Sequence, residues 1–376
     1  MKSPLCEPFR IGQMELRNRI VMPPMVTKYG SEESYVTERI KNHYEARAQG
    51  GAALIIVEST YVHKCGRNFM NQLGISDDKF IPGMSELVLA IRRHGAKAAI
   101  QLNHGGRMAK SELSKTQPVA PSPLASIEGE VPREMTVAEI KEIVAYFAKA
   151  ALRAKEAGFD GVEIHGAHGY LIHQFLSRSS NKRQDIYGDG LTNRARFFIE
   201  VIKAVREAVG NDYPVWCRID GKEYGVEEGI TLEEAQEVAR MIQEASADAI
   251  HVSASGPKAP NNLTSPIFVP AVIVNLAEGI KKAVTIPVIT VGKVTVEAGE
   301  IILEEGKADL IAMGRALLAD PELPNKVASG RLEDITPCTD CGECRDDLRS
   351  PNVAGIGCQV NAALGREAES EIIPGK

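Results

Sequence analysis

The chain alternates short apolar segments with helical patterns, and this unit is repeated eight times over about 320 residues. Several junctions share one signal, in which glycine ends the helix and a small or polar residue enters the next segment: Gly50-Gly51-Ala52, Gly95-Ala96-Lys97, Ala157-Gly158-Phe159-Asp160 and Gly306-Lys307-Ala308-Asp309. Repeated units of this length predict an α/β fold, a (β/α)8 TIM barrel. An open doubly wound sheet is the alternative, but no GxGxxG motif follows the first predicted strand.

The predicted strands cover residues 18–25, 52–57, 96–102, 157–162, 213–220, 248–253, 286–291 and 309–313. The predicted helices cover residues 37–49, 81–95, 136–157, 193–209, 231–245, 270–283, 295–305 and 318–329. Thr136 with Glu139 is a typical helix start signal. The polar, proline-rich section 104–133 is too long for a simple connection, so it is expected to form a lid or an excursion.

The composition is that of an ordinary soluble protein, with 44% hydrophobic and 25% charged residues and a net charge of −6 over 376 residues. This charge favours neither nucleic acid nor an anionic membrane as a partner. The sequence has no apolar signal segment at its start and no run approaching the roughly 20 apolar residues of a membrane-spanning helix. We therefore expect a cytoplasmic protein whose seven cysteines are thiols or metal ligands.

The stretch EIHGAHGY, residues 163–170, follows the fourth predicted strand. His165, His168 and Tyr170 are therefore expected just past a strand's carboxyl end, where barrel enzymes place their chemistry. Two imidazoles can polarise a carbonyl oxygen while a phenol delivers a proton nearby. Two alternatives stay open: the histidines are metal ligands together with His173, or they are polar loop residues without a chemical role.

Two late loops have the residues of a phosphate site. Gly292 and Lys293 follow the seventh predicted strand, and Gly314 and Arg315 follow the eighth. Barrel enzymes often bind phosphate in these two loops through backbone N–H groups, and the cations would add charge. The alternative is that the glycines only permit tight turns and the cations are solvated.

Polar residues also stand at strand ends where an apolar core is expected. They are Gln101, Arg218 and the run Glu58-Ser59-Thr60. A buried arginine is costly unless it meets an anion or an acceptor. An amide and an arginine facing one heteroaromatic ring would suit an isoalloxazine, with Arg218 stabilising the negative charge of reduced flavin. For Gln101 a satisfied core amide is the alternative.

Four of the seven cysteines lie within 21 residues near the C-terminus: Cys338, Cys341, Cys344 and Cys358. Three closely spaced cysteines followed by a fourth farther along the chain are typical of the ligands of a [4Fe-4S] cluster. A structural zinc site is the alternative, although zinc sites usually pair two two-cysteine knuckles. Cys6, Cys65 and Cys217 are interpreted as ordinary thiols, with Cys217 packed in a strand.

Several of these motifs resemble the old yellow enzyme family of FMN-dependent oxidoreductases, and specifically its iron–sulfur branch, which includes 2,4-dienoyl-CoA reductase and trimethylamine dehydrogenase. The resemblance covers nearly the whole chain. It rests on LRNRIVM (16–22), QLNHGGR (101–107), HGAHGYL (165–171), SNKRQDIYG (180–188) and NRARF (193–197), of which the last two are highly specific.

The resemblance implies a role for each matching position. Pro24, Met25 and Ser59 would line the flavin, and Gln101 and Arg218 would contact its pyrimidine edge. Gly292, Lys293, Gly314 and Arg315 would hold the phosphate. His165 and His168 would bind the substrate oxygen, Tyr170 would donate the proton, and Cys338, Cys341, Cys344 and Cys358 would hold a [4Fe-4S] cluster. Trimethylamine dehydrogenase is expected to bind its flavin through a cysteine where this chain has Val26, so the FMN is predicted to be non-covalent.

These expectations describe an FMN-binding TIM barrel over residues 1–330 and a cysteine-rich iron–sulfur tail over residues 331–376. The predicted reaction is reduction of an activated C=C bond of an enoate or enoyl substrate. The larger members continue into a dinucleotide-binding part, whereas this sequence stops at Lys376, so NAD(P)H, a ferredoxin or a flavoprotein is the expected electron donor.

Three other functions stay open from the sequence: an electron-transferring subunit, an amine dehydrogenase and a non-redox barrel lyase. The sequence determines neither the substrate nor the oligomeric state, and a homo-oligomer is one possibility.

Overall fold

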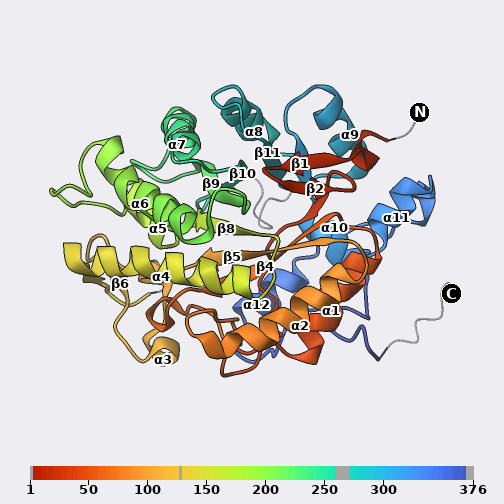
Figure 1. The fold of residues 1–376 in the computed structure, drawn as a ribbon, viewed down its shortest axis with the longest axis horizontal. Coiled ribbons are helices and arrows are strands. Elements are labelled where there is room, and N and C mark those ends of the chain that lie inside the picture. The colour runs from red at the N-terminus through yellow and green to blue at the C-terminus, as the bar shows by residue number, and fades with distance from the viewer. Residues whose placement is uncertain (1–2, 127–128, 260–270, 370–376) are drawn as a thin grey trace.

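Eight parallel strands close into a barrel in the computed structural model, which describes residues 3–126, 129–259 and 271–369 (Figure 1). In chain order they are β3 (Ile20–Met22), β4 (Leu54–Tyr61), β5 (Lys97–Asn103), β8 (Gly161–Gly166), β9 (Val215–Glu223), β10 (Ala249–Ser255), β11 (Val288–Val291) and β12 (Leu310–Ala312). The last strand pairs with the first, with Ile311 opposite Ile20. This closure confirms the predicted barrel over the open sheet.

Helices follow the strands and form the outer ring (Figure 1). They are α1 (Glu38–Gln49), α2 (Ile81–Arg92), α4 (Val137–Glu156), α6 (Leu191–Val209), α7 (Leu232–Glu244), α8 (Val274–Lys281), α9 (Val296–Glu304), α10 (Gly314–Ala319) and α11 (Leu323–Ala328). Threonine side chains cap four of them by accepting a backbone N–H of the first turn. The capping box of Thr136 and Glu139 at α4 is confirmed. None of the described helices is long and apolar enough to cross a membrane.

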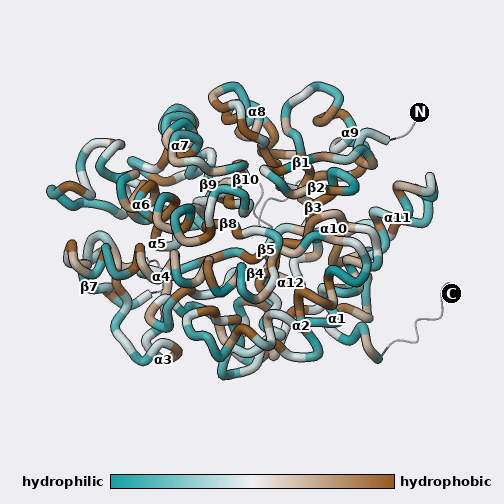
Figure 2. The backbone as a smooth tube through the Cα atoms, in the orientation of Figure 1, coloured by the Kyte–Doolittle hydropathy of each residue, from teal (hydrophilic) through white to brown (hydrophobic). Residues whose placement is uncertain are grey.

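Two apolar layers hold the barrel together. The larger lies between the strands and the helices, and the smaller fills the barrel interior, where Trp216 packs with Leu54, Ile56 and Ala249. Figure 2 shows hydrophobic residues along the central strands and hydrophilic ones in many of the outer loops. Strands with both faces buried are what a parallel barrel requires.

A hairpin that the sequence analysis did not identify closes one end of the barrel. It consists of β1 (Phe9–Ile11) and β2 (Met14–Leu16). Ile11, Met14 and Leu16 belong to the interior apolar layer. Gly12, at the turn, lies close to Asp248, which precedes β10, so the hairpin covers the amino-terminal end and leaves the carboxyl ends of the strands for the site.

The fourth strand was placed wrongly by the sequence analysis. Residues 157–160 end helix α4 and form a turn, in which Gly158 has a φ of +94°, and β8 spans Gly161–Gly166 instead. His165 therefore lies within the strand. Because Val162 and Ile164 pack in the outer layer, the alternation of a strand points Glu163 and His165 into the barrel.

The last helical region, predicted to begin with residues 318–329, consists of two helices, because α10 ends at Ala319 and α11 begins at Leu323. Pro321 lacks the N–H that would continue the first helix. The backbone of this turn approaches Gly50 so closely that a Cβ there would lie 1.8 Å from the Pro321 carbonyl oxygen. The start of the helix predicted over 270–283 lies outside the described residues, and α8 begins at Val274.

The predicted excursion 104–133 contains only short elements within its described part: a 3-10 turn (Gly106–Met108), α3 (Ser111–Ser114) and β6 (Val119–Ala120), which pairs with β7 (Arg133–Glu134). Helix α5 (Leu171–Leu176) follows β8 before α6. Further 3-10 turns lie at Pro4–Cys6, Lys64–Gly66, Asp78–Phe80 and Leu332–Asp334.

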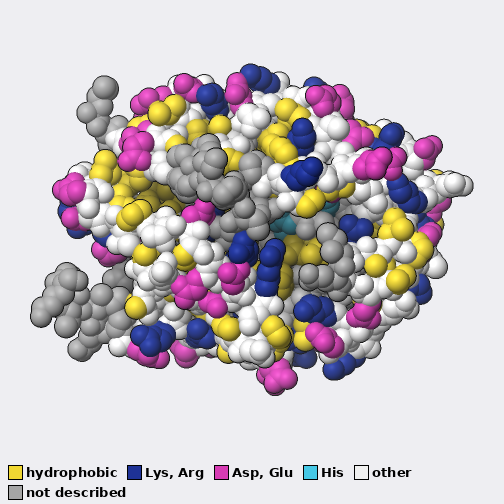
Figure 3. Space-filling view, turned by 180° about the vertical axis from the view of Figure 1, so that it is seen from behind, with side chains coloured by type: hydrophobic (Ala, Val, Ile, Leu, Met, Phe, Trp, Pro, Cys, Tyr) yellow, Lys and Arg dark blue, Asp and Glu magenta, His cyan; other side chains and the backbone are white. Residues whose placement is uncertain are grey.

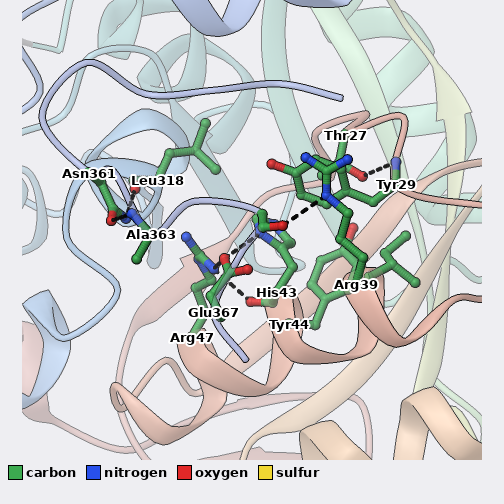
Figure 4. A network of polar contacts seen from close by, with 12 residues as sticks. Thr27, Tyr29, Arg39, His43, Tyr44, Arg47, Leu318, Asn361, Ala363 and Glu367 are labelled. Carbon is green, nitrogen blue, oxygen red and sulfur yellow. Dashed lines mark hydrogen bonds and ion pairs between the residues drawn. The ribbon is translucent and has the colours of Figure 1, made fainter. Parts of the chain in front are cut away.

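The segment after α11 contains α12 (Glu343–Arg349) and is tied to α1 by a buried polar network (Figure 4). Glu367 accepts a hydrogen bond from the buried Arg47, and the same carboxylate oxygen lies 3.3 Å from His43 Nδ1. Arg39 donates to the Gly365 carbonyl at 2.9 Å, and Tyr29 donates to the Ile356 carbonyl at 2.6 Å. The network holds the cysteine-bearing segment against the barrel.

The protonation states of His43 and Glu367 are set by burial, by their interaction with each other and by the charge of Arg47. Burial, with the charge of Arg47, lowers the pKa of His43 to about 4, so this imidazole is neutral at pH 7. Burial works to raise the pKa of Glu367, but the hydrogen bond and charge of His43 and the charge of Arg47 together hold it at about 2. The carboxylate is therefore ionised in the folded protein.

We predict that Glu367→Gln lowers the free energy of unfolding at pH 7 by about 3 kcal/mol, because it leaves a buried arginine without its anion. Since the folded pKa of Glu367 is below the ordinary value, its contribution is complete above about pH 4.3 and is lost as the pH falls toward 2. Urea unfolding at pH 7 and pH 3 should therefore show a smaller difference at pH 3. The control is Glu369→Gln, which removes an exposed ion pair with Arg366. An equal loss of unfolding free energy in both variants would contradict the stabilising role of Glu367.

Candidate active site

Two adjoining cavities, of about 520 Å³ and about 250 Å³, lie at the carboxyl ends of the barrel strands. The larger is within the usual size of cofactor sites. Both are lined by Pro24, Met25, His168, Arg218 and Arg315. Figure 3 shows a hollow on this face with histidine at its base and Lys and Arg side chains near its rim.

The structure brings together all of the residues predicted for flavin and substrate. The larger cavity adds Gly292, Lys293 and Gly314, and the smaller adds Ser59, Gln101, His165 and Tyr170. They come from the ends of β3, β4, β5, β8, β9, β11 and β12. Convergence at this rim follows from the parallel closure of the barrel.

His165 is held as a neutral imidazole with a defined tautomer. Its Nδ1 accepts the backbone N–H of Ala167 at 3.2 Å, so the ring proton is on Nε2. Burial, together with the charge of Arg218, lowers the pKa of His165 well below its ordinary value. The ring contacts those of His168 and Tyr170 edge-on, with centroid distances of 5.0 and 4.9 Å.

His168 lies in the turn after β8 with a φ of +60°. Its backbone N–H donates to the Asp220 carboxylate at 2.8 Å, and its Nε2 lies 2.7 Å from the Ser253 hydroxyl. Burial and the charge of Arg218 lower its pKa well below the ordinary value. Asp220 thus holds the backbone of this turn and Ser253 holds the ring, and neither residue was singled out from the sequence.

Tyr170 is a protonated phenol at neutral pH. Burial raises its pKa to about 12, although a hydrogen bond with the Asn68 side chain and the charge of Arg218 work in the opposite direction. The phenol lines the same cavity as the two imidazoles. The cavity is therefore lined by a phenol that keeps its proton at neutral pH.

Two polar atoms at this site have no hydrogen-bond partner within the described part of the chain. They are Arg218 Nε and Ser59 Oγ, both buried. Within the described residues, the Arg218 guanidinium donates one hydrogen bond, to the Ser253 hydroxyl at 3.4 Å. Orphaned buried polar atoms are costly without a partner, so they fit a polar ligand such as the edge of an isoalloxazine ring.

A buried carboxylate that the sequence analysis missed organises the floor of the site. Glu163 Oε1 accepts a hydrogen bond from Gln101 Nε2 at 2.8 Å. Its Oε2 accepts one from Trp216 Nε1 at 2.8 Å and lies 2.7 Å from His251 Nδ1. Burial works to raise the pKa of Glu163, but His251 and Arg218 hold it below the ordinary value. The bond to Gln101 orients that amide with its N–H toward Glu163.

The two loops predicted to bind phosphate contain positions that favour glycine or a left-handed backbone. Gly292 and Lys293 have φ values of +115° and +53°, and a Cβ on Gly314 would lie 2.7 Å from the Met25 sulfur. The Lys293 ammonium lies 2.8 Å from the Asp340 carboxylate, which also pairs with Arg315. Asp340 was not predicted to take part.

The four C-terminal cysteines line one small cavity, and two of them also reach the larger ones. Cys338 borders the 520 Å³ cavity and Cys344 borders the 250 Å³ cavity. The donor set and the shared cavity fit a thiolate-bound metal group. Among the described residues, however, no three His, Cys, Asp or Glu side chains form a site for a single metal ion.

The remaining thiols and His173 have other surroundings. Cys217 is buried in β9, as predicted. Cys65 is half-buried, with its sulfur 2.9 Å from His63 Nδ1 and 3.1 Å from His104 Nε2. His173 Nε2 lies 3.3 Å from Asp220 and 3.7 Å from Glu223, so it turns toward carboxylates, and no metal site is formed with His165 and His168 within the described part.

A family model described as the NADH:flavin oxidoreductase / NADH oxidase family matches residues 4–334. The chain belongs to this family. Membership confirms the predicted resemblance and the oxidoreductase class, and it implies FMN as the cofactor and an NAD(P)H-type donor.

The relatives of this chain include proteins of two lengths. An NADH oxidase of Thermoanaerobacter brockii is 45% identical over 369 residues, which are 95% of this chain and 56% of that protein. An NADPH dehydrogenase of Clostridium acetobutylicum is 42% identical over 331 residues, which are 88% of this chain and 95% of that protein. The chain thus spans little more than half of the first and nearly all of the second.

A solved structure of 2-naphthoyl-CoA reductase with 2-naphthoyl-CoA has the same fold. It superposes with a TM-score of 0.92 at 33% identity, covering 97% of this chain and 58% of that chain.

We predict that Glu163→Gln lowers the free energy of unfolding by about 2 kcal/mol, because one of the three buried donors loses its acceptor. Urea unfolding measures this loss. The control is Glu237→Gln, whose carboxylate makes only an exposed ion pair with Arg240. A loss no larger than that of the control would show that the network contributes nothing to stability.

Proposed function

We propose that this chain binds FMN without a covalent bond and reduces an activated C=C bond of an enoate or enoyl substrate with electrons from NAD(P)H. The observation that carries this proposal is the convergence of neutral His165 and His168 with protonated Tyr170 in one cavity. Two donors for a carbonyl oxygen beside a proton donor suit the reduction of a bond conjugated to that carbonyl.

The residues around the cavities fit FMN. Gly292, Lys293, Gly314 and Arg315 would hold the phosphate; Pro24, Met25, Ser59, Gln101 and Arg218 would surround the ring system. Val26 lines the smaller cavity and has no thiol to form a covalent link. When bound, FMN supplies the hydride that adds to the β-carbon of the substrate.

The side chains of this chain then account for the remaining chemistry. His165 and His168 donate hydrogen bonds to the substrate carbonyl oxygen and stabilise the negative charge that develops there, each by about 3 kcal/mol. Burial, together with the charge of Arg218, keeps both imidazoles neutral, so they act as donors that retain their protons. Tyr170 delivers its proton to the α-carbon.

The names of the relatives support a conjugated carbonyl substrate. A structural neighbour is a reductase of an aryl-CoA thioester, and two sequence relatives are named for oxidation of NADH or NADPH. The NADPH dehydrogenase has nearly the length of the barrel alone. We therefore infer that the barrel carries the hydride chemistry and that a CoA thioester is one substrate class to test.

The cysteine segment is proposed to bind a [4Fe-4S] cluster through Cys338, Cys341, Cys344 and Cys358. A tetrahedral zinc site needs every thiolate within about 2.3 Å of one ion, whereas a cluster spreads its ligands around a larger core. All four thiols line one small cavity, and three of them are closely spaced in the sequence, which supports a cluster. Cys338 and Cys344 border the flavin cavities, so the cluster would lie next to FMN.

A second candidate is an electron-transferring unit of a larger assembly, with a ferredoxin or flavoprotein as partner. It is favoured by the length of the NADH oxidase relative, of which this chain matches 56%. Co-purification of a flavoprotein from native cells, with NAD(P)H oxidation only in its presence, would support this candidate over the self-contained reductase.

We predict that Tyr170→Phe slows the reoxidation of reduced enzyme by an enoate at least about tenfold, because the α-carbon loses its proton donor. The reduction of the enzyme by NAD(P)H should be unchanged. Stopped-flow absorbance measures both half-reactions. The control is Tyr35→Phe, at an exposed tyrosine; unchanged reoxidation in Tyr170→Phe would remove Tyr170 from the mechanism.

We also predict that anaerobically purified protein contains one flavin and about four irons per chain. Cys358→Ser should lose the iron and keep the flavin, while Cys6→Ser, outside the cysteine segment, should keep both. An absorption spectrum with iron, sulfide and zinc assays decides the outcome. Zinc in place of iron would make the segment structural, and colourless protein would contradict the flavin proposal.

A further inference from the structure

A single carboxylate connects the cysteine segment to the phosphate loops. Asp340, between Cys338 and Cys341, contacts the Lys293 ammonium at 2.8 Å and also pairs with the Arg315 guanidinium. The Asp340 and Arg315 side chains are 14% and 21% exposed, and that of Lys293 is fully buried. The contacts are therefore made largely out of solvent, where charge interactions are strong.

The backbone places this carboxylate at some cost. Asp340 has a φ of +56°, in the left-handed region that disfavours residues other than glycine, although aspartate and asparagine tolerate it better than most. Its backbone N–H also lies 3.4 Å from the Cys338 sulfur. The backbone of Asp340 is thus held by the cysteine loop, and its side chain is held by Lys293 and Arg315.

The charge count shows what the contact does. Lys293 and Arg315 carry two positive charges and Asp340 carries one negative charge, so the three together present a net charge of +1 to the 520 Å³ cavity. A phosphate monoester has a charge between −1.5 and −2 at pH 7. Without Asp340 the same ligand would meet a charge of +2.

We propose that Asp340 sets the affinity of this site for the phosphate of FMN by competing with it for Lys293 and Arg315. The inference rests on the proposed function, since it takes FMN as the ligand. Coupling between two sites is reciprocal. Phosphate binding therefore weakens the ion pairs of Asp340 with the two cations. Conversely, these ion pairs, which attach the cysteine segment, weaken phosphate binding.

The test compares FMN with riboflavin, which has the same ring and no phosphate. The full chain is freed of bound flavin, and the Kd of each ligand is measured by quenching of flavin fluorescence. Asp340→Asn keeps the size and hydrogen-bonding capacity of the side chain and removes its charge. It should tighten FMN binding at least about tenfold and change riboflavin binding less than about twofold.

Two further variants separate charge from shape. Asp340→Glu keeps the carboxylate, so its FMN affinity should remain near that of the unmodified chain. Asp334→Asn removes an exposed carboxylate that pairs with Arg331 and should change neither ligand. Iron content, measured in each variant, reports whether the cysteine loop has kept its structure.

The outcomes are distinct. Unchanged or weaker FMN binding in Asp340→Asn would overturn the inference, and so would equal changes for FMN and riboflavin, because competition acts only on the phosphate. If the unmodified chain bound neither flavin, the proposed function itself would fail. If it bound FMN and the variant did not differ, only the role of Asp340 would fail.

Discussion

Closure of the barrel between β12 and β3 is the constraint on which the site depends. In a closed parallel sheet every strand delivers its carboxyl end to one rim, so Pro24 and Arg315 line the same cavities although they come from opposite ends of the chain. The other rim is covered by the β1–β2 hairpin, whose apolar side chains complete the interior layer. The fold thus leaves one end of the barrel for chemistry.

The polar floor of the site depends on balanced buried charge. Arg218 is buried among imidazoles and works against their protonation, while Glu163 supplies the neighbouring negative charge. A buried arginine without such an anion would be costly. Glu163 therefore offsets the buried charge of Arg218, while burial and the charge of Arg218 keep His165 and His168 neutral.

The C-terminal segment completes the site from the outside. The Glu367–Arg47 ion pair with α1 holds its far end, and Asp340 attaches its cysteine loop to Lys293 in the loop after β11. Cys338 and Cys344 consequently border the two cavities. The segment is a wall of the site, which joins the cysteines to the proposed flavin chemistry in space as well as in sequence.

The sequence by itself determined the barrel, because the alternation of apolar strands with helical patterns is a local signal that the βα units repeat. It also indicated which side chains meet at the rim, since polar residues at the ends of parallel strands converge. Only the tertiary structure decided where β8 begins, and hence that Glu163 points inward to Gln101, Trp216 and His251. It likewise decided the break before α11 against Gly50 and the reach of Asp340 to Lys293. These features depend on contacts between residues far apart in the chain, and local patterns do not encode such contacts.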